Sequence, residues 1–107
     1  MVINRFEVWL VNLDPALGNE INKTRPCLVI SPNVVNKHLG TITIAVMTST
    51  IKPYPTRVDC IFQKRSGQVA LDQMRSVDKI RFIKKLGVLD KTTCKIICDV
   101  LAELFKL

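Results

Sequence analysis

Apolar residues in this chain fall in short runs that are separated by proline, glycine and asparagine. Runs of this length between turn-forming residues are typical of β-strands. The pattern predicts strands at residues 7–13, 27–31, 41–47, 57–62 and 69–72, and at residues 75–84 in one or two pieces. Residues 33–38, which follow a Ser-Pro pair, can form a helical turn. We therefore expect a mostly-β chain.

The C-terminal segment follows a helical period instead. Apolar residues recur there at i, i+3, i+4 and i+7 spacing, from Cys94 to Phe105. Asp90 precedes them as a good N-cap, and Leu89 can pack against Cys94 as a hydrophobic staple. One amphipathic helix would then cover a small curled sheet, so we predict a mostly-β barrel with a terminal helix.

The size and charge of the chain limit its organisation and its partners. A chain of 107 residues buries roughly two-thirds of the surface that its unfolded form exposes, so we expect one domain over residues 1–107. The 16 Lys and Arg residues exceed the 9 Asp and Glu residues, which gives a formal net charge of +7. A small basic domain favours a polyanionic partner: nucleic acid, an acidic protein or an anionic membrane.

Several classes of protein fit the sequence poorly. The apolar runs are far shorter than the ~20 residues that span a bilayer. Charges near the N-terminus stand where a signal peptide would be apolar, so we expect a cytoplasmic protein without membrane association. The four cysteines form no C-x-x-C pair and there is one histidine, so we expect no metal and no cofactor. Small buried apolar roles are expected for these cysteines.

Polar candidates for chemistry gather at the ends of the predicted strands. Glu20, Lys23 and Arg25 lie on a loop that opens at Gly18 and leads into the strand at 27–31. A guanidinium at such a junction is suited to binding a phosphate, because its donor fork is rigid and always charged. Further candidates follow later strands: Thr48, Ser49, Asp72, Gln73 and Arg75.

Three blocks of sequence carry a family resemblance. The first contains VWLVNLDP at residues 8–15, G-x-E at 18–20 and KTRP at 23–26. The second is VMTS at 46–49 with YP at 54–55, and the third is VALDQMRSVDK at 69–79 with KLG at 85–87. In this order and spacing the blocks resemble the PemK/MazF-type toxins of bacterial type II toxin–antitoxin systems.

The resemblance implies a mainly β, SH3-like small barrel of the CcdB/PemK type, with short helical insertions and a C-terminal α-helix. It implies a homodimer that acts as an mRNA interferase, a metal-independent and sequence-selective endoribonuclease that cuts single-stranded RNA and arrests growth. It also implies a cognate acidic antitoxin and DNA binding by the toxin–antitoxin complex. An acidic, initially disordered segment of that partner would cover the basic RNA groove.

Matching positions assign roles to individual residues. Arg25 and Thr48 match the family's catalytic arginine and threonine, and Glu20 matches an acidic residue of the substrate loop. Some members have a histidine where this chain has Asn19, and an arginine where it has Ala70. These departures argue against a mechanism centred on histidine or aspartate. The predicted catalytic residues are therefore Arg25, Thr48 and Glu20.

A second set of residues is predicted to contact RNA. Tyr54 lies between two prolines in a loop, where its ring can stack on a base. Asp72 matches a carboxylate that some members use catalytically, although we favour a role in capping or bracing a turn over catalysis for it. The predicted RNA-contacting residues are Asn19, Lys23, Ser49, Lys52, Tyr54, Asp72, Gln73 and Arg75.

The chemistry of RNA cleavage fits these residue types. The 2′-hydroxyl attacks the adjacent phosphorus in line and leaves a 2′,3′-cyclic phosphate and a 5′-hydroxyl, so the protein must orient the attack and stabilise the growing charge. Arg25 can donate two hydrogen bonds to the phosphoryl oxygens, and Thr48 can donate another or orient the nucleophile. Glu20 or a water can take the proton, which leaves the base open. A non-catalytic toxin that binds DNA gyrase and an RNA-binding module remain alternative functions.

Overall fold

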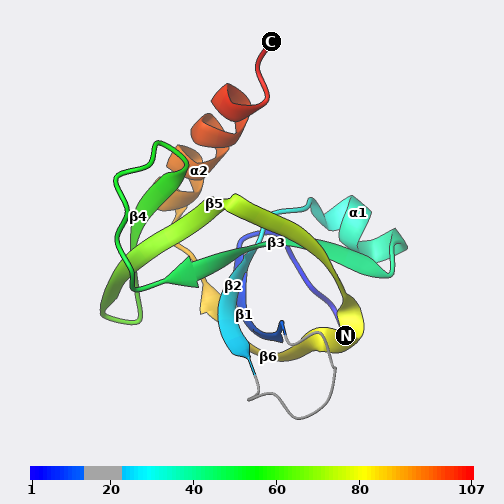
Figure 1. The fold of residues 1–107 in the computed structure, drawn as a ribbon. Coiled ribbons are helices and arrows are strands. Elements are labelled where there is room, and N and C mark those ends of the chain that lie inside the picture. Colours follow the sequence, from blue (N-terminus) through cyan, green and yellow to red (C-terminus); the bar gives the residue numbers. More distant parts are fainter. Residues whose placement is uncertain (14–22) are drawn as a thin grey trace.

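The computed structural model describes residues 1–13 and 23–107 (Figure 1). Its elements, in chain order, are β1 (Glu7–Asn12), β2 (Thr24–Val29), α1 (Asn33–His38), β3 (Thr41–Thr48), β4 (Arg57–Phe62), β5 (Arg65–Asp78), the 3-10 turn η1 (Lys79–Arg81), β6 (Phe82–Val88) and α2 (Lys91–Leu104). Strands predominate, as the short apolar runs predicted.

The strands form one antiparallel sheet in the order β4-β5-β3-β2-β1-β6. The sheet curls on itself, with the long strand β5 arching over β3 (Figure 1). The two outer strands meet through a side chain, because the Gln63 amide beyond β4 donates a hydrogen bond of 2.8 Å to the Leu86 carbonyl of β6. The curled sheet with its terminal helix confirms the predicted small-barrel fold class.

Alternating side chains give the sheet two buried faces. On β3, Ile42 and Ile44 belong to one apolar cluster, and Ala45 and Met47 belong to another. The first cluster fills the inside of the curl, and the second lies under α2, which contributes Ile97 and Cys94. Since apolar burial contributes about 25 cal/mol per Å², both faces stabilise the central strands and hold their ends rigidly.

The C-terminal helix begins as predicted. The Asp90 carboxylate accepts a hydrogen bond of 2.9 Å from the Thr93 backbone N–H, which satisfies a free donor of the first turn. Leu89 and Cys94 are both buried in the cluster beneath the helix, in the arrangement that the staple predicted. The short helix at residues 33–38 is also confirmed.

The β4–β5 hairpin was only partly predicted. Its loop is the dipeptide Gln63-Lys64, and both residues have positive φ angles of 50° and 67°. Two-residue hairpin turns of this type favour Asn-Gly or Asp-Gly, so Gln-Lys gave no turn signal. As a result, the predicted strand at 69–72 began too late and ended too early: β5 runs unbroken over Arg65–Asp78, and η1 separates it from β6.

Candidate active site

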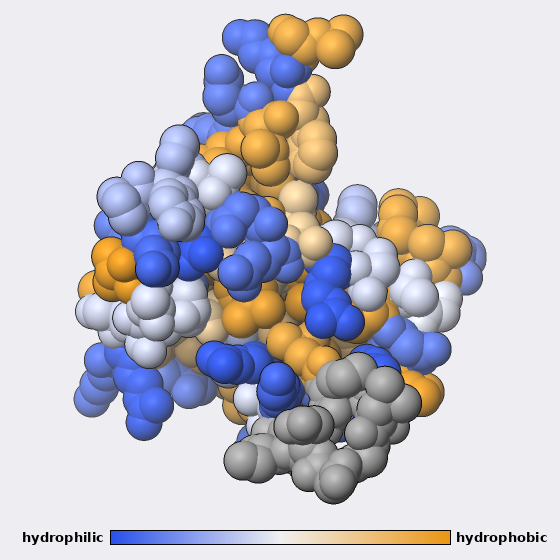
Figure 2. Space-filling model, in the orientation of Figure 1, coloured by the Kyte–Doolittle hydropathy of each residue, from blue (hydrophilic) through white to orange (hydrophobic). Residues whose placement is uncertain are grey.

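A cavity of about 520 Å³ opens between the start of β2, the end of β3 and the β4–β5 hairpin. On the face shown in Figure 2, hydrophilic side chains cover the turn of that hairpin and surround a smaller hydrophobic area. The residues that line the cavity are Arg25, Pro26, Met47, Thr48, Ser49, Cys60, Phe62, Gln63, Arg65, Ser66, Gly67, Gln68 and Leu86.

The pairing of β2 with β3 explains why Arg25 and Thr48 share this cavity. Cys27 lies opposite Val46 in the antiparallel ladder. Continuing the same register towards the end of β3 places Arg25 across from Thr48, and both residues line the cavity. The Arg25 side chain is exposed, and no side chain of the described residues pairs with its guanidinium. Two of the three residues with predicted catalytic roles are thus brought together, with the cation open to a ligand.

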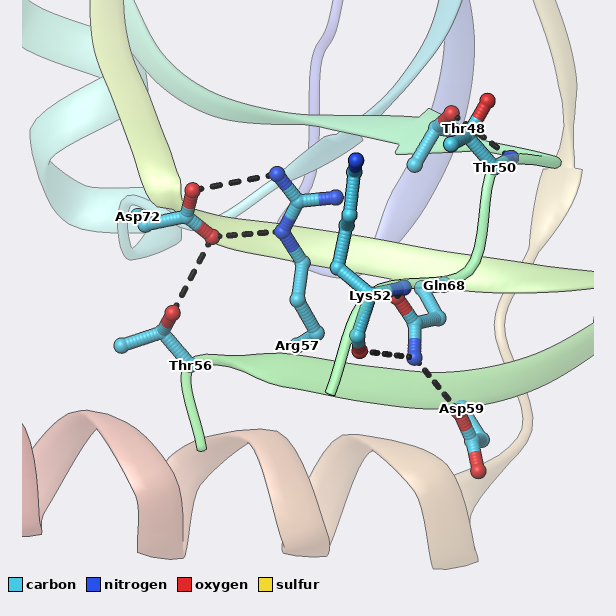
Figure 3. A network of polar contacts seen from close by, with 8 residues as sticks. All are labelled: Thr48, Thr50, Lys52, Thr56, Arg57, Asp59, Gln68 and Asp72. Carbon is cyan, nitrogen blue, oxygen red and sulfur yellow. Dashed lines mark hydrogen bonds and ion pairs between the residues drawn. The ribbon is translucent and has the colours of Figure 1, made fainter. Parts of the chain in front are cut away.

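The Thr48 hydroxyl is oriented by its own turn. Its oxygen accepts a hydrogen bond of 3.1 Å from the backbone N–H of Thr50 (Figure 3). A hydroxyl that accepts in this way keeps its own proton for donation. Thr48 therefore keeps a free hydroxyl donor at the cavity wall.

Two arginines place positive charge on the β2 side of the site. Burial raises the pKa of the Cys27 thiol to about 12, while the guanidinium groups of Arg75 and Arg25 act on it in the opposite direction. Arg25 lies two residues before Cys27 on β2, and Arg75 lies on β5 opposite Ile44 of β3. This local field favours a phosphate at the cavity.

Residues 49–56 connect β3 to β4, and Gln68 of β5 holds the middle of this loop (Figure 3). The buried Gln68 amide accepts a hydrogen bond of 3.0 Å from the Lys52 N–H and donates one of 3.2 Å to the Lys52 carbonyl. Its nitrogen also donates to the Asp59 carboxylate at 2.9 Å. The β3–β4 loop is thereby fastened to a strand that lines the cavity.

The loop is held again where it enters β4. The Arg57 guanidinium donates to both carboxylate oxygens of Asp72, at 2.7 and 3.2 Å, and the Thr56 hydroxyl donates to the same carboxylate at 3.1 Å (Figure 3). These hydrogen bonds, that from Arg57 above all, lower the pKa of Asp72. The Arg57 guanidinium lies 5.4 Å from the centroid of the Tyr54 ring. Asp72 is therefore engaged by neighbours on β4.

Among the other predicted site residues that the structure describes, one lines the cavity and the rest lie outside its lining. Ser49 lines it, whereas Lys23, Lys52, Tyr54, Gln73 and Arg75 are exposed on the surrounding strands and loop. Asn19 and Glu20 lie outside the described residues. Sequence reasoning did not identify Arg57, Gln68 or Gly67, because their roles depend on strand register and carry no motif of their own.

Two further features concern metals and membranes. Across residues 1–13 and 23–107, no group of three or more His, Cys, Asp or Glu side chains is arranged to hold a metal ion. No helix in those ranges has the length and apolar character needed to cross a bilayer.

Comparison with known proteins places this chain in a family. The family described as PemK-like, MazF-like toxin of type II toxin-antitoxin system matches residues 4–105. Endoribonuclease EndoA of Bacillus subtilis (strain 168) is 31% identical over 96 residues, which cover 84% of this chain and 83% of that protein.

Solved structures agree with this match. A MazE–MazF complex (Form-II) from Deinococcus radiodurans has a TM-score of 0.84 at 27% identity and covers 100% of this chain and 98% of its own. MazF (Form-I) from the same organism has a TM-score of 0.81 at 28% identity and covers 100% of this chain and 99% of its own. The chain therefore belongs to the PemK-like, MazF-like family of toxins of type II toxin–antitoxin systems.

Proposed function

We propose that this toxin is an endoribonuclease that cleaves single-stranded RNA without a metal ion. The observation that carries the proposal is the meeting of Arg25 and Thr48 at one open cavity. The cavity volume of about 520 Å³ falls in the range of ligand pockets, about 300–1,000 Å³. The relative named as an endoribonuclease supports the same activity and disfavours the gyrase-binding and RNA-binding alternatives.

The proposed reaction begins with attack by the RNA 2′-hydroxyl on the adjacent phosphorus. The new bond joins the 2′-oxygen to phosphorus, and the bond to the 5′-oxygen breaks, so the products carry a 2′,3′-cyclic phosphate and a 5′-hydroxyl. Arg25 donates hydrogen bonds to the phosphoryl oxygens as their charge grows, and Thr48 donates a further one. A water or Glu20 accepts the proton of the 2′-hydroxyl, and the leaving 5′-oxygen takes a proton from a second water.

Substrate contacts extend along the basic surface around the cavity. Lys23, Lys52 and Arg75 are exposed cations that can bind successive phosphates, which positions the strand without reading its sequence. Asn19, Ser49 and Gln73 supply polar side chains for base edges. These residues, with Tyr54, form the proposed RNA-binding set.

The proposed assembly is a homodimer of one toxin domain over residues 1–107 with a cognate antitoxin. The MazE–MazF complexes of Deinococcus radiodurans, which share the fold, support such a partner. Because the net charge is +7, the antitoxin segment that covers the cavity should be acidic, and binding should weaken as salt rises. A cytoplasmic location is proposed, and it is supported by the absence of disulfides among the cysteines, all four of which are free.

The test uses purified wild-type, Arg25→Ala and Lys95→Ala proteins with a long single-stranded RNA in excess EDTA. Lys95 is exposed on α2 and serves as a matched control for the lost positive charge. Discrete cuts by wild type and Lys95→Ala that disappear with Arg25→Ala, at unchanged circular dichroism, would support the proposal. Equal cleavage by Arg25→Ala would refute the role of Arg25.

A further inference from the structure

Tyr54 occupies an unusual position on the β3–β4 loop. Tyr54 as a residue is 48% exposed, although the Arg57 guanidinium lies 5.4 Å from the centroid of its ring. Pro53 and Pro55 flank it and restrict the backbone on both sides. The Arg57 N–H also donates a hydrogen bond of 3.0 Å to the Tyr54 carbonyl, which closes a tight turn. An aromatic ring is thus held at the surface with little freedom left to lose on binding.

The support beneath this ring is an ion pair between Arg57 and Asp72. The Arg57 side chain is only 7% exposed, and its guanidinium forms a two-pronged ion pair with Asp72. Asp72 belongs to β5, the strand on which Gln68 both lines the cavity and holds the Lys52 backbone. Through Arg57 and Asp72, the ring is therefore fastened to β5, a strand that also lines the cavity.

We propose that Tyr54 is a stacking platform for one base of the bound RNA, and that Arg57 and Asp72 are positioning residues that hold its ring in place. This inference rests on the proposed RNA substrate. Every base has a π face, and stacking on an exposed aromatic ring is a general means of gripping single strands. Arg57 binds the ring from one side and leaves the other side to the base.

The same contacts change the interpretation of Asp72. Both carboxylate oxygens of Asp72 accept hydrogen bonds from Arg57, and one of them also accepts a hydrogen bond from the Thr56 hydroxyl. The positive charge of Arg57 balances the negative charge of Asp72. A carboxylate in this state has little capacity to accept a proton or to bind a base. Asp72 acts on the substrate through Arg57 and Tyr54.

The direct test measures binding without cleavage. Tyr54 is the only tyrosine in the chain, so protein labelled on tyrosine gives ring signals from this residue alone in NMR spectra. We expect these signals to shift upfield when random-sequence 2′-O-methyl RNA nonamers, which lack the nucleophile, are added. Tyr54→Ala should weaken binding of the nonamers by roughly 5- to 150-fold, the range for loss of one stacked base, and Tyr54→Phe should retain it.

A double-mutant cycle tests the positioning roles. Arg57→Lys keeps the charge but loses the two-pronged contact, so it should raise KM with little change in kcat. If Arg57 acts through the ring, Arg57→Lys should have no added effect in a Tyr54→Ala background. Equal effects in both backgrounds would overturn the positioning role. A loss of stability alone would appear as a lower melting temperature with unchanged KM, and it would also count against that role.

The outcomes separate this inference from the proposed function. If wild type cleaves RNA while Tyr54→Ala keeps the same kcat/KM and the same preference at every nucleotide position, the platform is wrong and the ribonuclease stands. If the ring signals shift with the nonamers but wild type cleaves no RNA, the platform stands and the cleavage activity fails. Ring signals that stay unchanged at saturating RNA would also refute the platform.

Discussion

Gly67 lies directly against the backbone of Thr48. A Cβ atom placed on Gly67 would come within 2.5 Å of the Thr48 carbonyl oxygen and 3.3 Å of its carbonyl carbon. Real Cβ atoms do not approach backbone so closely, so the close contact between β3 and the β4–β5 hairpin depends on glycine at this position. Thr48, for which we propose a catalytic role, thus lies against a residue that carries no functional group.

Replacing Gly67 with alanine should therefore displace Thr48. We expect Gly67→Ala to lower kcat by at least about tenfold, because small displacements of a catalytic group have large effects, and to destabilise the fold by about 1–3 kcal/mol. Single-turnover cleavage and urea unfolding would measure the two effects. Gly40→Ala is the matched control, since a Cβ there meets nothing within 4 Å. Wild-type kinetics for Gly67→Ala would contradict the proposed positioning.

The Thr48 hydroxyl should matter as a hydrogen-bond donor. Thr48→Val keeps the shape of the side chain but removes the donor, and we expect it to lower kcat by roughly 10²- to 10³-fold, the range for one oxyanion-binding group. Thr48→Ser keeps the hydroxyl and should retain most of the activity. If the two variants lost activity equally, the hydroxyl would not be the group that acts.

Gln68 should control the order of the β3–β4 loop. Gln68→Leu leaves the Lys52 N–H and carbonyl without their partner, at a penalty of about 1–3 kcal/mol. We expect faster hydrogen exchange at the Lys52 amide and a KM that rises more than kcat falls. For the exchange measurement at Lys52, Gln63→Leu is a control of the same chemistry, because its lost partner is the Leu86 carbonyl on the other side of the cavity. Unchanged exchange at Lys52 in Gln68→Leu would contradict this role.

Glu7 should make stability depend on pH in the acid range. Burial would raise the pKa of Glu7, but hydrogen bonds from the Asn4 N–H and the Trp9 indole, together with Lys85, outweigh burial and lower it. A lowered folded pKa contributes stability above the ordinary value of 4.5, and this stability is lost as the pH falls through the folded pKa.

Glu7→Gln removes the stability that ionised Glu7 contributes. We expect the variant to unfold about 1–3 kcal/mol more easily than wild type at pH 7, with a smaller difference at pH 3. Urea titrations at the two pH values measure the difference, and the exposed Glu103→Gln is the control. If the difference in the free energy of unfolding between wild type and Glu7→Gln were larger at pH 3 than at pH 7, this role of Glu7 would be contradicted.

The sequence predicted those parts of the fold that depend on local signals. Asp90, as an N-cap residue, predicted the start of α2 correctly, and the spacing of Cys94 and Ile97 predicted which face of the helix is buried. The strand at residues 57–62 was predicted with the bounds observed, Arg57–Phe62. The Gln63-Lys64 turn carries no local signal in the sequence. For this reason the strand predicted after it, at residues 69–72, was shorter than the β5 strand that forms one wall of the site.

The site was predictable only in part for the same reason. Arg25 and Thr48 belong to sequence blocks that resemble a family, and the register of β2 against β3 brings them together. The pairing of Arg57 with Asp72 follows from the register of β4 against β5, which no local pattern encodes. Contacts between strands depend on the whole sheet, so they become visible only in three dimensions.

The central claim is cleavage by the RNA's own 2′-hydroxyl without a metal ion. After the cut site is mapped, an RNA oligonucleotide with one 2′-deoxy substitution on the 5′ side of that bond should be compared with the all-RNA oligonucleotide in excess EDTA. We predict that the protein cuts the all-RNA strand to a 2′,3′-cyclic phosphate and leaves the substituted strand intact although it binds both. Cleavage of the substituted strand at the same bond, or cleavage that appears only when Mg²⁺ is added, would contradict the account.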